Sequence, residues 1–334
     1  MIVTIVIPTH NRGAKLSATL ARLLANDADG FDEVEIVVVD DGSTVPVGPL
    51  VDGFRSLPPF TLRCVRLAPN VGPAGARNAG FRAACGEVVL FIDDDILAPP
   101  DLIRRHVEAH RVRPGSVVCG SWRLVAPEPM TPLYRYIDSL GFDGAAGSTE
   151  EFVPVATVSS GHISVERAMF PPEEGVYRDN LSVPAAEEYE LSLRLRNRGI
   201  PVLLAHRIVA LHDHPVTLDN MCRQAFKHAM GCAEAAVKCP ATLELQDVRN
   251  IMAANRPILR RDTLVLICKK AVKRLLAMRR PRSVLLRVTQ HIERLTPRAQ
   301  LCAPFYRAVL GLHFFAGVRE GLEVFSEGIG VPGC

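Results

Sequence analysis

Short apolar runs alternate with amphipathic segments through the first two thirds of the chain. Residues 2–7 (IVTIVI), 34–41 and 87–95 are rich in β-branched and other apolar side chains, a composition that predicts buried strands. Residues 14–25, between the first two runs, carry leucines at helical spacing. Strands that are apolar throughout and alternate with helices are typical of a parallel sheet with helices on both faces. The sequence therefore predicts an α/β fold with a mostly parallel sheet.

Further strands and helices continue this alternation. Strands are predicted at 61–69, 116–125 and 200–205, and helices at 75–84, 101–112 and 187–199. Residues 127–154 are rich in Pro, Gly and acidic side chains, which predicts a long surface excursion with the character of a lid. From Cys222 onward the pattern is helical. We therefore predict an α/β domain over 1–220, with halves of about 1–100 and 101–220, and a basic, amphipathic helical extension over 221–334.

The composition is that of a protein with a substantial core. Of the 334 residues, 48% are hydrophobic and 22% charged, which argues against a disordered chain. The nine cysteines form no CxxC pair, so we expect reduced thiols rather than a zinc ribbon or disulfide framework. No charged leader precedes the first strand, and no apolar run, residues 305–317 included, reaches the roughly 20 residues of a membrane-spanning helix. These features predict a cytoplasmic protein.

Positive charge is concentrated near the carboxyl terminus. The net charge is +3, yet residues 256–294 hold twelve Lys or Arg against Asp262 and Glu293, a balance of +10. Residues 264–280 form an amphipathic pattern with apolar and basic faces. This pattern predicts either peripheral contact with an anionic membrane, at its inner face, or packing of the apolar face onto the α/β domain. Nucleic-acid binding is not expected, because no aromatic side chains interleave the basic ones.

Acidic side chains follow two of the predicted strands. Asp40 and Asp41 end one strand, and Asp93, Asp94 and Asp95 end another. Ligands of parallel α/β sheets bind beyond the carboxyl ends of the strands, so both clusters are expected at one crevice with the 10–12 loop. Carboxylates crowded in this way repel one another unless a cation lies among them. The alternative interpretations are a solvated acidic turn after one strand and a helix cap after the other.

Five segments in order resemble the inverting glycosyltransferases of family 2. They are PTHNR (8–12), VVVDDGS (37–43), NVGPAGARNAG (70–80), FIDDDI (91–96) and EEYELSLRLRNRG (187–199). The resemblance covers residues 1 to about 215. It implies a GT-A fold, a nucleotide-sugar donor and a divalent metal, either manganese or magnesium.

The resemblance also implies which side chains hold the metal. The aspartate triplet corresponds to the family's Asp-any-Asp motif, with Asp95 as metal ligand and with Asp93 and Asp94 near the ribose or behind the metal. Asp93 is a second candidate ligand. His212 and His214 are further candidate ligands, because many relatives use a histidine in this region. A structural role for this histidine pair is the alternative.

Candidate donor contacts come from four loops. One of Asp40 and Asp41 is expected to accept a hydrogen bond from the nucleobase, such as that of uracil's ring N–H. The other residues expected to contact the nucleoside, the phosphates, the sugar or the acceptor are Thr9, Asn11, Arg12, Gly72, Arg77, Asn78, Gly161 and His162.

Inverting transfer also needs a base for the acceptor hydroxyl. Glu187, Glu188 and Glu190 are the candidates, at the start of one predicted helix. The resemblance places the base at Glu188, with Glu187 as its neighbour, although the family has an aspartate there. Acidic side chains at a helix amino terminus are also favourable without any catalytic role.

We therefore expect a metal-dependent glycosyltransferase that moves one sugar, preferably from a UDP-sugar, to a hydroxyl of a glycan, a lipid-linked carrier or a small molecule. One alternative is a catalytically silent nucleotide-sugar-binding or membrane-associated scaffold protein. Another is a sugar-1-phosphate nucleotidyltransferase, which the absence of a GxGTR loop after the first strand disfavours.

Overall fold

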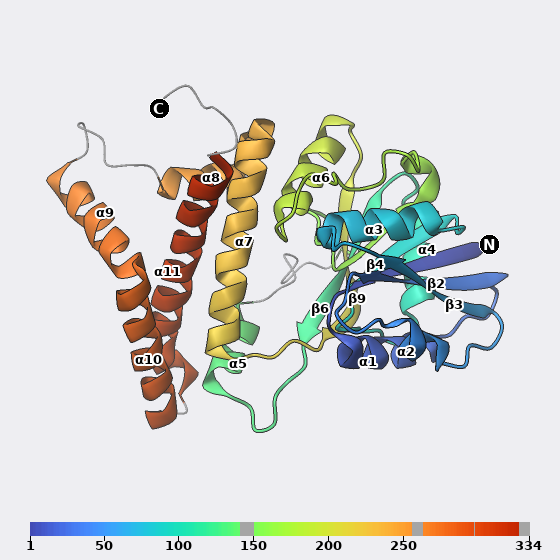
Figure 1. The fold of residues 1–334 in the computed structure, drawn as a ribbon, viewed down its shortest axis with the longest axis horizontal. Helices are drawn as coiled ribbons and strands as arrows, with labels where there is room; N and C mark the ends of the chain where they lie inside the picture. The colour runs from blue at the N-terminus through green and yellow to red at the C-terminus, as the bar shows by residue number, and fades with distance from the viewer. Residues whose placement is uncertain (141–149, 256–262, 297, 327–334) are drawn as a thin grey trace. The chain divides into compact units, whose positions relative to one another are not determined.

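The computed structural model describes residues 1–140, 150–255, 263–296 and 298–326 (Figure 1). The chain divides into two compact units. The first unit comprises Met1–Val125, Gly141–Ser182 and Glu190–His214, and the second comprises Ala126–Leu140, Val183–Tyr189 and Pro215–Cys334. The sequence did not indicate the two short stretches that join the second unit, and the domain boundary at residue 220 stays a prediction.

The first unit is built on a nine-stranded mixed sheet. Four neighbouring parallel strands have the order β3-β2-β1-β4, with β1 at Ile2–Thr9, β2 at Glu33–Asp41, β3 at Phe60–Leu67 and β4 at Val88–Ile92. The sheet continues through β8 (His162–Glu166), β6 (Val117–Leu124), β9 (Val202–His212) and β5 (Ile96–Leu97), and β7 (Val153–Pro154) pairs with β9.

The predicted α/β sheet is confirmed, and its parallel character is limited to part of it. β8 runs antiparallel to both β4 and β6, and β5 and β7 run antiparallel to β9. The predicted strands did not include β8, because they rested on continuous apolar runs. The five residues of β8, HISVE, instead alternate polar and apolar side chains, which is also a strand pattern.

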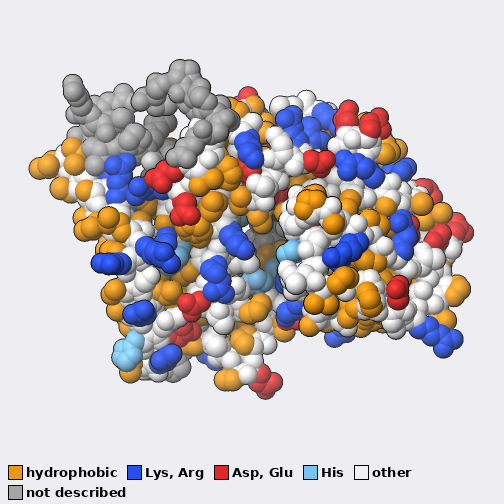
Figure 2. All heavy atoms as spheres, viewed as in Figure 1, with side chains coloured by type: hydrophobic (Ala, Val, Ile, Leu, Met, Phe, Trp, Pro, Cys, Tyr) orange, Lys and Arg blue, Asp and Glu red, His pale blue; other side chains and the backbone are white. Residues whose placement is uncertain are grey.

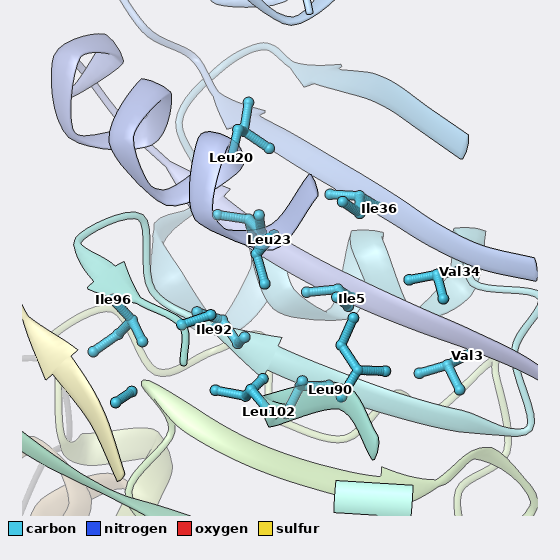
Figure 3. Packing of buried hydrophobic residues seen from close by; sticks show 14 of the residues in the cluster. Val3, Ile5, Leu20, Leu23, Val34, Ile36, Leu90, Ile92, Ile96 and Leu102 are labelled. Atoms are coloured by element: carbon cyan, nitrogen blue, oxygen red, sulfur yellow. The ribbon is translucent and has the colours of Figure 1, made fainter. Parts of the chain in front are cut away.

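Helices cover both faces of this sheet. They are α1 (Gly13–Leu24), α2 (Gly48–Asp52), α3 (Gly72–Ala83), α4 (Leu102–Val112) and α6 (Ala186–Asn197), with a short 3-10 turn, η1, at Arg167–Met169. Neighbouring residues of a strand face opposite ways. Ile5 and Leu90 accordingly join a core with α1 and α4, which Figure 3 shows in part, while Val6 and Phe91 join a second core with α3 and α6.

The second unit is helical, as predicted. It contains α5 (Pro132–Ser139), α7 (Leu218–Lys238), α8 (Gln246–Ala254), α9 (Leu264–Ala277), α10 (Arg279–Leu295) and α11 (Ala299–Ser326), with a 3-10 turn, η2, at Pro240–Glu244. α7 and α11 pack along one another (Figure 1). A Cβ atom at Gly317 of α11 would lie 2.2 Å from the carbonyl oxygen of Phe226 in α7, so only glycine permits this close approach.

Two expectations about loops and lengths are corrected. Part of the predicted 127–154 excursion forms α5, whose Thr131 side chain caps the helix at the backbone N–H of Tyr134, and residues 141–149 lie outside the described residues. The expected short 305–317 helix is part of the 28-residue α11, which is long and apolar enough to cross a membrane. In its most apolar stretch, 44% is buried inside the protein.

Candidate active site

The carboxyl ends of three parallel strands bring several of the predicted site residues of the first unit to one edge. β1 ends at Thr9, which pairs in register with Asp40 of β2, and β4 ends just before Asp93. Thr9 donates a hydrogen bond of 2.6 Å from its hydroxyl to Asp94. This hydrogen bond connects the aspartates that follow β4 to the carboxyl end of β1.

Asp95 and two histidines form a compact cluster of metal-ligand atoms. The carboxylate of Asp95 lies 3.2 Å from Nε2 of His212 and 3.5 Å from Nδ1 of His214. One ligand atom from each of the three residues lies within 4.8 Å of the other two. The pairing of Ile96 in β5 with His212 at the end of β9 produces this arrangement, although Asp95 and His212 are 117 positions apart in sequence.

The three consecutive aspartates have different environments. Burial raises the pKa of Asp94 to about 6, against the opposing effect of Arg12. Burial by itself would also raise the pKa of Asp95, but hydrogen bonds from His212 and His214 and the charges nearby hold it well below its usual range. Asp95 therefore stays ionised, as a metal ligand must be.

The side chain of Arg12 contacts two of these three aspartates. Its guanidinium forms an ion pair with Asp94 at 2.9 Å and another with Asp95. Arg12 is partly exposed, whereas both carboxylates are buried. A cation from the 10–12 loop thus compensates charge that would otherwise be crowded and desolvated.

Asp93 is oriented by two different segments. Arg77 of α3 donates to its carboxylate at 2.7 Å, and the backbone N–H of Asp93 donates to the carbonyl of Gly161. A Cβ atom at residue 161 would lie 2.6 Å from a carboxylate oxygen of Asp93. A side chain at position 161 would therefore displace this carboxylate, and Arg77 positions the aspartate. In this arrangement Asp93 does not join the three-residue cluster of ligand atoms.

The two aspartates at the end of β2 hold the surrounding loops. Asp40 is fully buried and accepts hydrogen bonds from the backbone of Ser43 and Val47 and from Arg66. Burial alone would raise its pKa, but these bonds outweigh that effect and lower it. Asp41 accepts from the backbone N–H groups of Val71 and Gly72, the latter at φ +84° where α3 begins. A carboxylate has about four acceptor positions, so Asp41 retains capacity for a further donor.

Comparison with known proteins assigns a family to the amino-terminal part of the chain. Residues 4–136 match the family described as glycosyl transferase family 2. This part of the chain is a glycosyltransferase family 2 domain. The uncharacterized glycosyltransferase YfnE of Bacillus subtilis is 33% identical over 120 residues, which are 36% of this chain and 30% of YfnE.

Two further comparisons extend this result. The undecaprenyl-phosphate 4-deoxy-4-formamido-L-arabinose transferase of Aeromonas hydrophila is 35% identical over 108 residues, 32% of this chain and 33% of that protein. These matches thus span only about a third of the length of either relative. A mannosyltransferase of Pyrobaculum calidifontis, solved with GDP-Man and Mn²⁺, superposes with a TM-score of 0.56 over 94% of this chain and 86% of its own, at 17% identity. The last comparison confirms the predicted GT-A fold.

Two residues expected to touch the donor, Asn78 and His162, form hydrogen bonds inside the first unit. Asn78 is buried, and its amide bonds with the backbone of Val176 and Tyr177 and with Asp179. The His162 ring is fully buried, 3.1 Å from the carbonyl of Ser121 and 3.0 Å from the ring of His106. Each side chain uses its polar atoms inside the protein, which favours a structural role, and direct contact of either residue with the donor stays a prediction.

The loop after β1 keeps Asn11 and Arg12 accessible. Asn11 has φ +57°, and its side-chain oxygen accepts from the backbone of Thr44, which ties the loops after β1 and β2 together. The structure thereby brings together the two loops from which nucleoside contacts were expected. Contact of Thr9, Asn11 and Arg12 with the nucleoside stays a prediction.

The three glutamates at the start of α6 have different surroundings. Glu190 is buried and paired with Arg178 at 2.8 Å and Arg194 at 3.0 Å, which removes it from the candidate bases. Glu187 is buried, and Glu188 is partly exposed. Ala185, just before the helix, has φ +79°, a left-handed conformation that costs a non-glycine residue about 1 to 3 kcal/mol.

Trp122, the single tryptophan, was not among the predicted site residues. In the structure its indole meets the ring of His212 edge-on, with centroids 5.0 Å apart. The cause is the register of the parallel pair β6 and β9, in which Leu124 lies opposite His212 and Trp122 opposite Ala210. No local sequence signal indicates this contact.

Proposed function

We propose that this protein is an inverting, metal-dependent glycosyltransferase that moves one sugar from a UDP-sugar to a hydroxyl acceptor. The observation that carries the proposal is the Asp95, His212 and His214 cluster at the carboxyl edge of the sheet in a family 2 domain. A metal-ligand cluster at this edge matches the requirement of a diphosphate for a bridging cation.

The donor set fits a divalent cation. One carboxylate and two imidazoles converge, and Nδ1 of His212 is buried without a hydrogen-bond partner among the described atoms. A divalent cation held there would neutralise the donor's diphosphate and stabilise it as a leaving group. We favour manganese, because magnesium prefers ligand sets made of oxygen alone whereas imidazole suits transition metals. The likeness to a fold that carries Mn²⁺ in the mannosyltransferase supports this choice.

The donor's nucleoside is assigned to the loops after β1 and β2. Asp41 retains acceptor capacity for the ring N–H of uracil. Asn11 and Arg12 are accessible, and Asn11 is hydrogen-bonded to Thr44 in the loop that follows Asp41. Asp93, oriented by Arg77, is assigned to the ribose. Asp40 is assigned a structural role, because Ser43, Val47 and Arg66 already use its carboxylate.

The base is assigned to Glu188. Direct displacement at the anomeric carbon requires that the acceptor hydroxyl lose its proton as its oxygen attacks, which inverts the configuration. Of the three glutamates, Glu190 is held by two arginines, Glu187 is buried, and Glu188 is accessible. The acceptor class we propose is a sugar hydroxyl on a lipid-linked carrier, and the site of action is the cytoplasmic face of a membrane. The undecaprenyl-phosphate named for one relative supports the lipid part of this proposal, whereas the base applies to a hydroxyl and not to a phosphate oxygen.

The first experiment is calorimetric titration of the full chain with UDP, GDP and dTDP, with Mn²⁺ and after chelation. The proposal expects tight binding of UDP only with Mn²⁺, lost in Asp95→Asn and retained in Glu188→Gln. A preference for GDP or dTDP would change only the assignment of the donor's nucleobase. Absence of binding to any diphosphate by the folded protein would instead favour the silent scaffold alternative.

The second experiment separates transfer from binding. Wild type and Glu188→Gln are compared for hydrolysis of UDP-sugars and for transfer to lipid-linked acceptors, with product anomers assigned by NMR. A product that retains the donor's anomeric configuration would contradict the inverting mechanism. Release of pyrophosphate from UTP and a sugar-1-phosphate would indicate the nucleotidyltransferase alternative.

A further inference from the structure

The exposed side of α9 is apolar along its whole length. Leu264, Val265, Val272, Leu275 and Leu276 are exposed, at 76% for Leu264 and 59% for Leu275. At 100° per residue they fall within about 120° of the helix circumference. The sequence left open whether this face packs onto the protein or remains exposed. In the structure, the second unit leaves this apolar face of α9 exposed.

A groove continues this apolar side from α9 to α11. Its volume is about 600 Å³, and its walls are almost entirely apolar. The lining residues are Cys268, Val272, Lys273, Leu276, Ala308, Gly311 and Leu312. Further along α11, Leu301 and Phe305 are exposed as well. The apolar surface therefore extends over two helices of the same unit.

α10 adds positive charge to exposed apolar side chains. Val284, Val288 and Leu295 are exposed, and so are the three arginines Arg280, Arg287 and Arg294. The arginines recur every seventh residue and therefore share one side of the helix. Among the described residues, no carboxylate lies within ion-pair distance of these three arginines.

The same helices carry little negative charge. Residues 263–295 hold nine Lys or Arg and one acidic residue, Glu293. In Figure 2 the left edge of the view, where Figure 1 places α9 and α10, shows mostly hydrophobic and basic side chains. We call this set of exposed residues on α9, α10 and α11 the α9–α10 surface.

We propose that the α9–α10 surface docks on an anionic lipid bilayer. Exposed apolar patches of this extent are uncommon on soluble monomers. A bilayer with anionic headgroups would interact with both the exposed apolar side chains and the positive charge of this surface. The aliphatic side chains would enter the acyl boundary, while the arginines would stay among the phosphates. Nucleic acid would satisfy the charge and leave the aliphatic side chains in water. This inference rests on residues other than those of the proposed reaction and does not depend on it.

The test is flotation of the full chain with vesicles, without donor or metal. We expect binding to vesicles of phosphatidylcholine with 30% phosphatidylglycerol and little binding to phosphatidylcholine alone. Two variants probe the two contributions: Val272→Glu with Leu275→Glu, and Arg280→Glu with Arg287→Glu and Arg294→Glu. Each basic residue near an anionic surface contributes about fivefold to partitioning, so the charge-reversal variant should lose well over tenfold. All five positions are exposed, so the fold should persist.

Matched controls carry the same substitutions on the first unit. Leu57→Glu with Val112→Glu replaces side chains that are 58% and 63% exposed, and Arg22→Glu with Arg55→Glu and Arg111→Glu reverses three exposed charges. Both controls should float as the wild type does. Equal loss in the controls, or no flotation of the wild type, would overturn the proposal. So would a dimer in light scattering that Val272→Glu with Leu275→Glu dissociates while flotation is unchanged, since the surface would then join two copies.

Discussion

One guanidinium nitrogen of Arg12 is hydrogen-bonded to the carboxylate of Asp95, the residue that also meets His212 and His214. A cation of the protein therefore occupies the same carboxylate that we assign to the metal. The two cations compete for Asp95, and this competition can be measured.

Replacement of Arg12 by methionine should strengthen Mn²⁺ binding in the absence of nucleotide. The side chain keeps its apolar length but loses the charge that repels the ion, which predicts a gain of about threefold to tenfold in affinity. The affinity is measured from the electron paramagnetic resonance signal of free Mn²⁺. Arg82→Met is the matched control, because Arg82 is also paired with an aspartate, Asp179, and is similarly exposed. Unchanged or weaker Mn²⁺ binding in Arg12→Met would count against Asp95 as ligand.

The emission of Trp122 should report metal binding. Its indole lies against His212, and it is the single tryptophan of the chain. Mn²⁺ held by His212 would quench this fluorescence in proportion to occupancy, whereas Asp95→Asn should show no saturable quenching. Saturable Mn²⁺ binding by resonance without any change in emission would exclude His212 as a ligand and leave Asp95 and His214.

Glu188→Gln should lower turnover by about a hundredfold to ten-thousandfold, the usual contribution of a general base, with donor affinity little changed. Glu190→Gln is the comparison. It breaks the pairs with Arg178 and Arg194, so its main effect should be on the free energy of unfolding. Near-normal turnover in Glu188→Gln would move the base assignment to Glu187.

The buried histidines of the first unit should make folding sensitive to acid. Burial lowers the pKa of His162 to about 4, and that of its neighbour His106 is also lowered by burial. An unfolded histidine has a pKa of about 6.5, so as pH falls from about 6.5 towards 4 the unfolded chain binds the proton first and stability is lost. His162 alone should contribute roughly 2 kcal/mol of this loss between pH 7 and pH 5.

Urea unfolding at pH 7 and pH 5 tests this effect by difference. The raised pKa of Asp94, about 6, acts in the opposite direction, because its folded form gains the proton first. The contribution of His162 is therefore the change in the free energy of unfolding between pH 7 and pH 5 for the wild type minus the same change for His162→Gln. His291→Gln, at an exposed histidine, is the control. Identical pH dependence in wild type and His162→Gln would refute the prediction.

Ala185→Gly should stabilise the protein by about 1 kcal/mol. Ala185 has φ +79°, a conformation that glycine adopts without steric cost, and the gain is reduced by the greater freedom of glycine in the unfolded chain. Thermal unfolding of the full chain provides the measurement. If strain before α6 also holds Glu188 in place, turnover should fall in this variant while stability rises. A lower melting temperature would show that no strain is stored there.

The local sequence was sufficient for the elements that rest on local patterns. Continuous β-branched runs determine β1, β2 and β4, because a strand buried on both faces must be apolar throughout. Leucine spacing similarly determines α1. The position of Asp40, Asp41 and the aspartate triplet at one edge follows from parallel strand order, since parallel strands end on the same side.

Tertiary structure decided which of these polar residues remain free to act. Asp40, Asn78, His162 and Glu190 all have the residue types of site groups, yet each uses its polar atoms to hold buried backbone or side chains. The Asp95, His212 and His214 cluster and the Trp122 contact depend on β5 and β6 pairing with β9. Partners so distant in sequence leave no local pattern, because strand register, and not spacing along the chain, sets which atoms meet.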